Sequence, residues 1–314
     1  MKIGIPRALF YHINPKMWLA YFEKLGVEVV LSPETNQKIF NDGIALSIDE
    51  SCLSSKVFMG HVKWLAGKCD KIFIPHIESF GPRENACPKF SGMYDIVKNT
   101  LDVPLISFNI NANYGFSEEK AYISLGKQLG FSSKVSRAAF LYAIDAQENF
   151  QKEQERIITK QLESSNLKVL VVSHYYNTHD EYIGKPIIRS LKKHGAEVIL
   201  ACDAGVAYKC GHERFTSTST WKFGKELLGT VNQLKDKVDG IVVVSTFPCG
   251  PDSMLNDFLR LEQKTVPMIT LVLDELQGQT GVETRIESFI DILSFEKLGD
   301  FLDREDRFEP EVAI

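Results

Sequence analysis

The sequence lacks the short motifs that identify most nucleotide-binding and metal-binding proteins. It contains no G-x-x-x-x-G-K-[ST], no G-x-G-x-x-G and no G-x-S-x-G, which are typical of P-loop NTPases, dinucleotide-binding folds and α/β-hydrolases. We therefore do not expect this chain to hydrolyse ATP by itself. Its six cysteines include no C-x-x-C pair, which removes the strongest pattern for a zinc ribbon or a ferredoxin.

The sequence also has no excess of positive charge and no long hydrophobic stretch. Its 36 Lys and Arg residues against 41 Asp and Glu residues give a net charge of −5, which argues against nucleic acid as the main partner. Apolar runs such as 169–172 and 241–244 are far too short to span a bilayer. No signal-peptide pattern precedes the first apolar run, so we expect a cytoplasmic protein. Its cysteines would then be metal ligands or buried thiols rather than disulfides.

Short apolar runs alternate with amphipathic segments along most of the chain. The runs lie at residues 3–5, 27–31, 72–77, 105–110, 169–172, 198–200, 241–245 and 269–273. They are apolar on both faces, as expected for parallel strands that helices cover on both sides. The alternation therefore predicts an α/β protein with two Rossmann- or flavodoxin-like domains.

A stretch without Gly or Pro separates the two series of runs. It covers residues 134–165 and becomes rich in Glu, Gln and Lys from residue 148 onward. This composition predicts one or two helices that join the two halves. The expected domains are residues 1–165, including these helices, and residues 166–314.

Cys52, Cys87 and Cys249 each lie at a break between an apolar run and a predicted helix. Loops that follow the carboxyl ends of parallel strands converge on one crevice, so three thiolates gathered there could hold an iron–sulfur cluster with one iron left open. Pro88 and Pro248 would fix the backbone direction beside two of these cysteines. Three buried free thiols are the alternative interpretation.

The other cysteines have weaker signals. Cys69 precedes a predicted strand, on the opposite side of the sheet, where packing is the expected role. Cys202 follows the run at 198–200 and is an alternative fourth ligand. Cys210 and His212 form an isolated C-x-H pattern, which is a weak metal signal.

Other polar residues at predicted strand ends are candidates for lining a ligand pocket. They are Arg7, Glu50, His174, Tyr175, Asn177, Asp274 and Glu275. Acidic residues at such positions either perform acid–base chemistry or cap the following helix. The 174–177 turn either borders a ligand or is an Asx-type turn. Arg7, at the end of the first predicted strand, either binds an anion or forms an ordinary ion pair.

Several motifs follow one another in a specific order. They include Gly4-Ile5-Pro6-Arg7, Asp49-Glu50-Ser51-Cys52, Cys87-Pro88-Lys89-Phe90, His174-Tyr175-Tyr176-Asn177 and Phe247-Pro248-Cys249-Gly250-Pro251. Over nearly the whole chain, this series resembles the acyl-CoA dehydratase activase-related family. That family is akin to 2-hydroxyacyl-CoA dehydratase subunits, such as the D-component of 2-hydroxyglutaryl-CoA dehydratase.

The resemblance implies one [4Fe-4S] cluster held by Cys52, Cys87 and Cys249 between two α/β domains, with a larger double-cubane-type cluster as the alternative. It further implies electrons from a separate ATP-dependent activase, an anaerobic setting and a homo- or heterodimer. The implied activity is that of a 2-hydroxyacyl-CoA dehydratase-like lyase or a low-potential reductase component, acting on an acyl-CoA or another small molecule. A non-catalytic electron-transfer or cluster-bearing subunit, and a metal-free CoA-type ligand-binding module, remain as alternatives.

Overall fold

The computed structural model describes residues 1–209, 219–276 and 278–305, and these residues contain two four-stranded parallel sheets. The first has the order β2-β1-β3-β4 and the second the order β6-β5-β7-β8. The strands are β1 (Lys2–Ile5), β2 (Glu28–Leu31), β3 (Lys71–Ser79), β4 (Leu105–Asn111), β5 (Leu167–Val172), β6 (Ala196–Leu200), β7 (Gly240–Thr246) and β8 (Met268–Leu273). The predicted α/β fold with two Rossmann- or flavodoxin-like sheets is confirmed.

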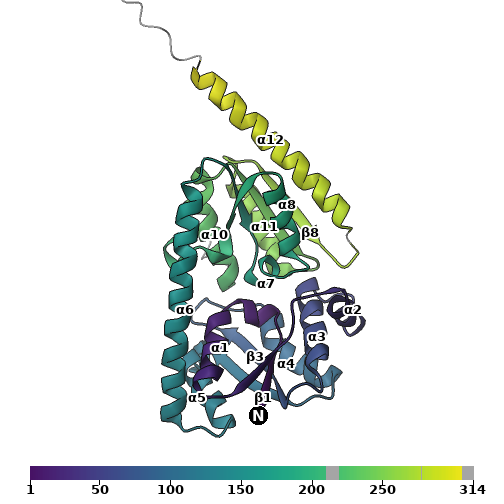
Figure 1. Cartoon of the computed structure of the whole chain (residues 1–314), viewed down its shortest axis with the longest axis vertical. Coiled ribbons are helices and arrows are strands. Elements are labelled where there is room, and N and C mark those ends of the chain that lie inside the picture. The colour runs from purple at the N-terminus through teal and green to yellow at the C-terminus, as the bar shows by residue number, and fades with distance from the viewer. Residues whose placement is uncertain (210–218, 277, 306–314) are drawn as a thin grey trace, which may run out of the picture.

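Helices flank both sheets (Figure 1). Those of the first half are η1 (Leu9–His12), α1 (Pro15–Lys24), α2 (Gln37–Ala45), α3 (Leu53–Leu65), α4 (Pro88–Thr100), η2 (Ala112–Tyr114) and α5 (Glu118–Gln128). Those of the second half are α7 (Tyr175–Thr178), α8 (Gly184–Lys193), η3 (Ala201–Asp203), α9 (Val206–Lys209), α10 (Lys222–Leu234), η4 (Lys235–Lys237), α11 (Gly250–Glu262) and α12 (Gln279–Glu305). None of the described helices combines the length and apolar character that a membrane span requires.

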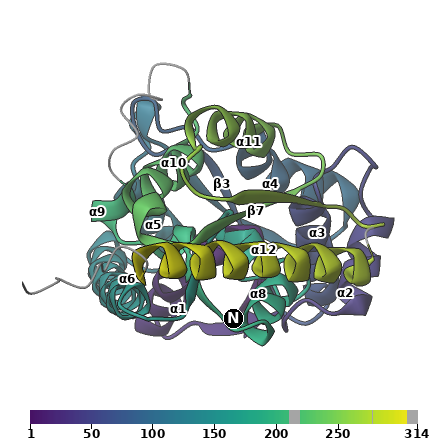
Figure 2. The same ribbon diagram turned by 90° about the horizontal axis from the view of Figure 1, so that it is seen from above.

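A single 30-residue helix, α6 (Ser133–Leu162), connects the two halves. It begins at Ser132, whose side chain accepts a hydrogen bond from the amide of Val135, as an N-cap serine should. The helix packs against α1 and α5 of the first half and against β6 of the second, and it runs along one side of both (Figure 1). Seen from above, α6 lies at one edge while α12 crosses beside α8 (Figure 2). The domain boundary near residue 165 stays a prediction.

The loops at the carboxyl ends of the two sheets meet between the halves. The amide of Leu53 donates to the carbonyl of Phe247 at 3.2 Å, and the amide of Asn85 donates to the carbonyl of Thr220 at 2.8 Å. In Figure 1, the N-terminus lies at the end of the first half that is remote from α7. In doubly wound sheets, ligands bind outside the carboxyl ends of the strands, so this junction is where a functional site is expected.

Candidate functional site

Three cysteines from distant parts of the chain gather at this junction. Cys52, Cys87 and Cys249 are the N-cap residues of α3, α4 and α11, each 13 residues long. The pKa of Cys87 is raised to about 11, first by burial and to a smaller extent by the charge of Cys52. The pKa of Cys249 is also raised, first by burial and then by Asp252 and the other two thiols. These mutual effects place the three thiols together.

The position of Cys52 between secondary-structure elements differs from the predicted one. Cys87 and Cys249 follow strands β3 and β7, as expected, but Cys52 lies in the turn between α2 and α3. Its place is set by helix packing, because α2 and α3 cross in close contact. The site therefore combines two strand-end loops with one helix–helix turn.

Tyr176, on the one-turn helix α7, faces the three thiols. Burial raises its pKa well above the ordinary value, and Asp252, Cys87, Cys249 and Cys52 raise it further. The hydroxyl therefore stays protonated and can donate a hydrogen bond. The turn at residues 174–177 was recognised in the sequence, but Tyr176 was not singled out as a site residue. Only the tertiary fold shows which tyrosine of the pair points to the cysteines.

A buried histidine–aspartate pair borders the same thiols. His174 Nε2 lies 2.8 Å from Asp252 Oδ1, and the two side chains are only 6% and 4% exposed. The His174 ring stacks on Tyr176, with centroids 5.1 Å apart. Among the described residues, Asp252 Oδ2 has no hydrogen-bond partner, although buried polar atoms are normally paired. An acceptor without a partner thus lies next to the cysteines, which is a feature of ligand sites.

The three sulfurs are not arranged to share a single ion. In the described part of the chain, the three sulfurs do not form a set with all ligand atoms within 4.8 Å of one another. That spacing disfavours one shared ion, whereas the thiolates of a cluster bind different irons. Three helix N-termini directed at the site would stabilise the negative charge of a thiolate-bound cluster.

The other predicted pocket residues lie in several places. Asn177 is fully buried, and its side-chain oxygen accepts a hydrogen bond from Ser54 at 2.6 Å, so it joins α7 to α3 rather than lining a pocket. Glu275 pairs with the buried Lys56. Asp274 accepts a hydrogen bond from the amide of Leu276 at 2.9 Å, which is a turn contact, and Glu50 is exposed.

Two of the candidates, Arg7 and Tyr175, line a cleft of about 240 Å³ between the halves. Tyr175 faces away from Tyr176, and its hydroxyl accepts a hydrogen bond from Lys209 at 2.5 Å. None of the three gathered cysteines lines this cleft. Helix α7 therefore separates two different environments, the thiols on one side and the cleft on the other.

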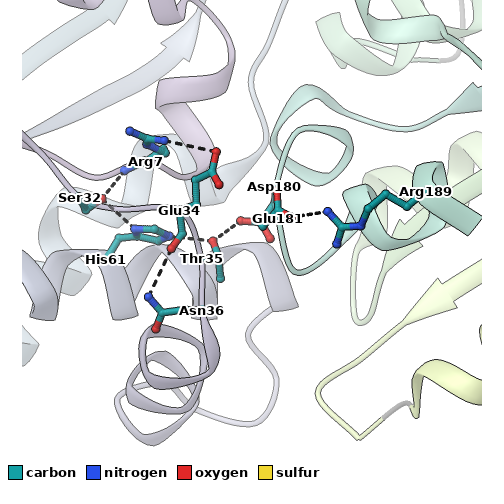
Figure 3. A network of polar contacts seen from close by, with 9 residues as sticks. All are labelled: Arg7, Ser32, Glu34, Thr35, Asn36, His61, Asp180, Glu181 and Arg189. Carbon is teal, nitrogen blue, oxygen red and sulfur yellow. Dashed lines mark hydrogen bonds and ion pairs between the residues drawn. The ribbon is translucent and has the colours of Figure 1, made fainter.

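A buried chain of hydrogen bonds crosses the junction beside this cleft (Figure 3). The amide of Arg7 donates to Ser32 Oγ at 2.7 Å, and Ser32 Oγ lies 2.8 Å from His61 Nδ1. His61 Nε2 lies 2.9 Å from Thr35 Oγ1, which donates to Asp180 Oδ2. Each group in this series of hydrogen bonds donates to the next, and the series ends on the Asp180 carboxylate. Every polar group in it therefore has a hydrogen-bond partner. The network ties the first half to the second.

Burial shifts the titration of both ionisable groups in this network. The pKa of His61 is lowered to about 3, first by burial and then by the charge of Arg7, so the imidazole is neutral and can donate from one nitrogen only. Burial raises the pKa of Asp180 to about 6, although Thr35 and two backbone amides oppose the shift. The sequence analysis did not single out His61 or Asp180 as site residues, because their partners lie far apart in the chain.

The remaining cysteines do not belong to the group formed by Cys52, Cys87 and Cys249. Cys69 packs against the backbone of Gly4 in β1, which agrees with a packing role. Cys202 lies in η3 beside His179 and Asp203. Cys210 and His212 fall outside the described residues.

Comparisons with known proteins give one family match. Residues 2–202 match the family described as CoA enzyme activase uncharacterised domain (DUF2229). That match includes Cys52 and Cys87, whereas Cys249 lies beyond it. None of the curated proteins matches the chain.

Solved structures similar to the chain include two manganese-bound proteins. One is the SBP FpvC from Pseudomonas aeruginosa in complex with Mn²⁺, with 12% identity, coverage of 94% of this chain and 97% of that chain, and a TM-score of 0.28. The other is a mutant Mn-bound periplasmic metal binding protein from Candidatus Liberibacter asiaticus, with 11% identity, coverage of 93% and 100%, and a TM-score of 0.27. At these TM-scores the likeness says nothing about what this chain binds.

Proposed function

Because the chain belongs to the CoA enzyme activase uncharacterised domain family, we propose that it is an iron–sulfur redox protein that receives electrons from a separate ATP-dependent activase. Cys52, Cys87 and Cys249 would hold one [4Fe-4S] cluster. When bound, such a cluster supplies one-electron chemistry at low potential. The observation that supports this best is the convergence of three N-cap thiols at the junction of the two sheets.

The electrostatics of the site agree with a cationic iron core. Burial and mutual repulsion raise the pKa values of Cys87 and Cys249, so three bare thiolates would be unfavourable there. A bound metal offsets this cost, since a coordinating thiol loses its proton outright. The dipoles of α3, α4 and α11 would then stabilise the remaining negative charge.

Tyr176, His174 and Asp252 would tune the site from one side. The Tyr176 hydroxyl stays protonated because of its burial and would donate a hydrogen bond to a sulfur atom, an interaction that shifts cluster potentials. His174 holds the Asp252 carboxylate through Oδ1 and leaves Oδ2 free to bind water, a substrate oxygen or the open iron position.

The cleft favours a second candidate, a non-catalytic electron-transfer or cluster-bearing subunit. A dehydratase-like enzyme needs its substrate to reach the cluster, but none of the three cysteines lines the cleft of about 240 Å³ or the cavities of about 390, 540 and 640 Å³. A carrier needs no such access. Reduction by an activase without turnover of any acyl-CoA would support the carrier, whereas turnover would support the lyase or reductase.

Iron and sulfide analysis of anaerobically purified or reconstituted protein tests the proposal. We expect about four irons and four sulfides per chain, with loss of the cluster absorption in Cys249→Ala, Cys52→Ala and Cys87→Ala. Cys69→Ala is the matched control and should keep the cluster. Metal-free melting curves show whether each variant still folds. Fewer than about one iron per chain, or a full cluster in folded Cys249→Ala, would overturn the three-cysteine site.

A further inference from the structure

A second cluster of metal-type ligands lies across α7 from the three cysteines. His179 is the C-cap residue of α7, and Cys202 and Asp203 belong to η3, directly after β6. One ligand atom from each of these residues lies within 4.8 Å of the others. We propose that His179, Cys202 and Asp203 bind a single Zn²⁺-type divalent ion, and that His12, which lies outside this 4.8 Å set, moves in as the fourth ligand when the ion binds.

The three side chains already point at one another. His179 Nε2 lies 2.8 Å from Asp203 Oδ1, and Cys202 Sγ lies 3.7 Å from the same oxygen. Cys202 is only 2% exposed, while the His179 side chain is 30% exposed and lines the cleft. An ion can therefore enter from the cleft and reach a buried thiol behind it.

His12 supplies the independent observation. Its ring stacks on that of His179, with centroids 6.2 Å apart and planes at 22°, and it is 8% exposed at the wall of the same cleft. Among the described residues, its Nε2 atom has no partner. The backbone of Arg7 forms a hydrogen bond to the ring, which must involve Nδ1, because Nε2 is unpaired.

This tautomer is the one that a metal ligand needs. With Nδ1–H held by a backbone carbonyl, the lone pair of Nε2 is free, the usual arrangement of a metal-bound imidazole. A buried imidazole nitrogen without a hydrogen-bond partner among the described residues therefore lies next to the His–Cys–Asp set.

The donor types select the class of ion. Imidazole nitrogen and thiolate sulfur suit Zn²⁺ and neighbouring transition metals, whereas Mg²⁺ and Ca²⁺ prefer oxygen ligands. Four such ligands would form a closed, structural type of site. The cation would also remove the proton from the Cys202 thiol.

The site would join the two halves of the protein. His12 belongs to η1 of the first half, whereas the other three ligands belong to the second, and η1 already contacts α7. It is also electrostatically separate from the iron–sulfur site. The Tyr175 hydroxyl is influenced by Cys202 and Asp203, whereas that of Tyr176 is influenced by Cys52, Cys87 and Cys249.

Cobalt titration of the full-length chain tests this site. The background is the triple variant Cys52→Ser/Cys87→Ser/Cys249→Ser, so the result does not depend on the proposed cluster. Added Co²⁺ should bind at about one ion per chain with a thiolate-to-cobalt charge-transfer band, Zn²⁺ should displace it, and Zn²⁺ should raise the melting temperature. Adding Cys202→Ser should abolish the band, and His12→Ala should weaken binding at least tenfold, because even the loss of an outer-shell partner costs about 10–100-fold in metal affinity.

Controls separate this site from other thiols. Cys69→Ser and Cys210→Ser in the same background should keep the band. If Cys202→Ser does not fold without metal, His179→Ala on the exposed side gives the same test. The proposal is overturned if the triple variant shows no charge-transfer band, if the band survives Cys202→Ser or His179→Ala, or if Cys210→Ser removes it. A His179–Asp203 ion pair alone would give the first of these results.

Discussion

At the scale of single residues, burial determines which ionisable side chains have pKa values that differ from their ordinary ones. Asp180 receives hydrogen bonds from Thr35 and from the amides of Tyr182 and Ile183, yet burial still raises its pKa to about 6. The same exclusion of water keeps His61 neutral. These groups form a fixed hydrogen-bonding chain between the halves, so their charge state affects stability.

Asp180 should make the protein less stable as the pH rises from about 4 to about 6. Its pKa is higher in the folded state than the ordinary 3.8, so the folded chain binds this proton more tightly and the free energy of unfolding falls as the proton is lost. The full effect is on the order of 2–3 kcal/mol. Urea unfolding of wild type and Asp180→Asn across this range should show the fall in wild type only. Parallel pH profiles of the free energy of unfolding for wild type and Asp180→Asn would contradict this prediction.

At the scale of elements, a close helix crossing determines where Cys52 lies. Helices α2 and α3 touch through Gly43 and Gly60. A Cβ atom at Gly60 would lie 1.9 Å from the carbonyl oxygen of Ile39, and one at Gly43 would lie 2.0 Å from that of Lys56. Backbone therefore packs directly on backbone, which holds α3 and its N-cap Cys52 at the junction.

Gly60→Ala should destabilise the protein by about 1–3 kcal/mol, because the added methyl group forces the two helices apart. Gly92→Ala in α4 is the matched control, since nothing lies within 4 Å of a Cβ atom there. Replacing this helical glycine by alanine should leave the free energy of unfolding unchanged or raise it by up to about 1 kcal/mol. Urea unfolding measures both. Equal effects of the two substitutions would show that helix propensity, and not the crossing, is responsible.

At the scale of the whole molecule, the two halves share no sheet among the described residues, and a continuous apolar core together with buried polar contacts holds them together. Lys56 in α3 pairs with Glu275 after β8, and its side chain is only 2% exposed. Ser54 bonds to Asn177 and Thr246 at 2.6 and 3.1 Å. Since each partner lies in the other half, these pairs help to set the relative placement of the two halves, together with α6 and the shared apolar core.

Glu275→Gln should destabilise the protein by about 2–4 kcal/mol, because it leaves the buried Lys56 ammonium without a charge partner. Lys56→Met in the same chain should recover part of the loss, so a double-mutant cycle gives a coupling energy. The control is Glu283→Gln, which breaks the exposed pair with Lys193 and should cost less than about 0.5 kcal/mol. Similar losses from Glu275→Gln and Glu283→Gln would refute the role of the buried pair.

The sequence by itself determined the α/β class, the strands and the helix that joins the two sheets, because hydrophobic periodicity and the absence of Gly and Pro are local signals. It also indicated which cysteines precede helices. The tertiary structure alone decided that the packing of α2 on α3 places Cys52 and that Tyr176 rather than Tyr175 faces the thiols. It also decided that Asn177 is buried and joins α7 to α3. It alone placed His12 beside His179. The reason is physical: these neighbours are up to about 200 residues apart in sequence, and only the parallel sheets and the packing between the halves bring them together.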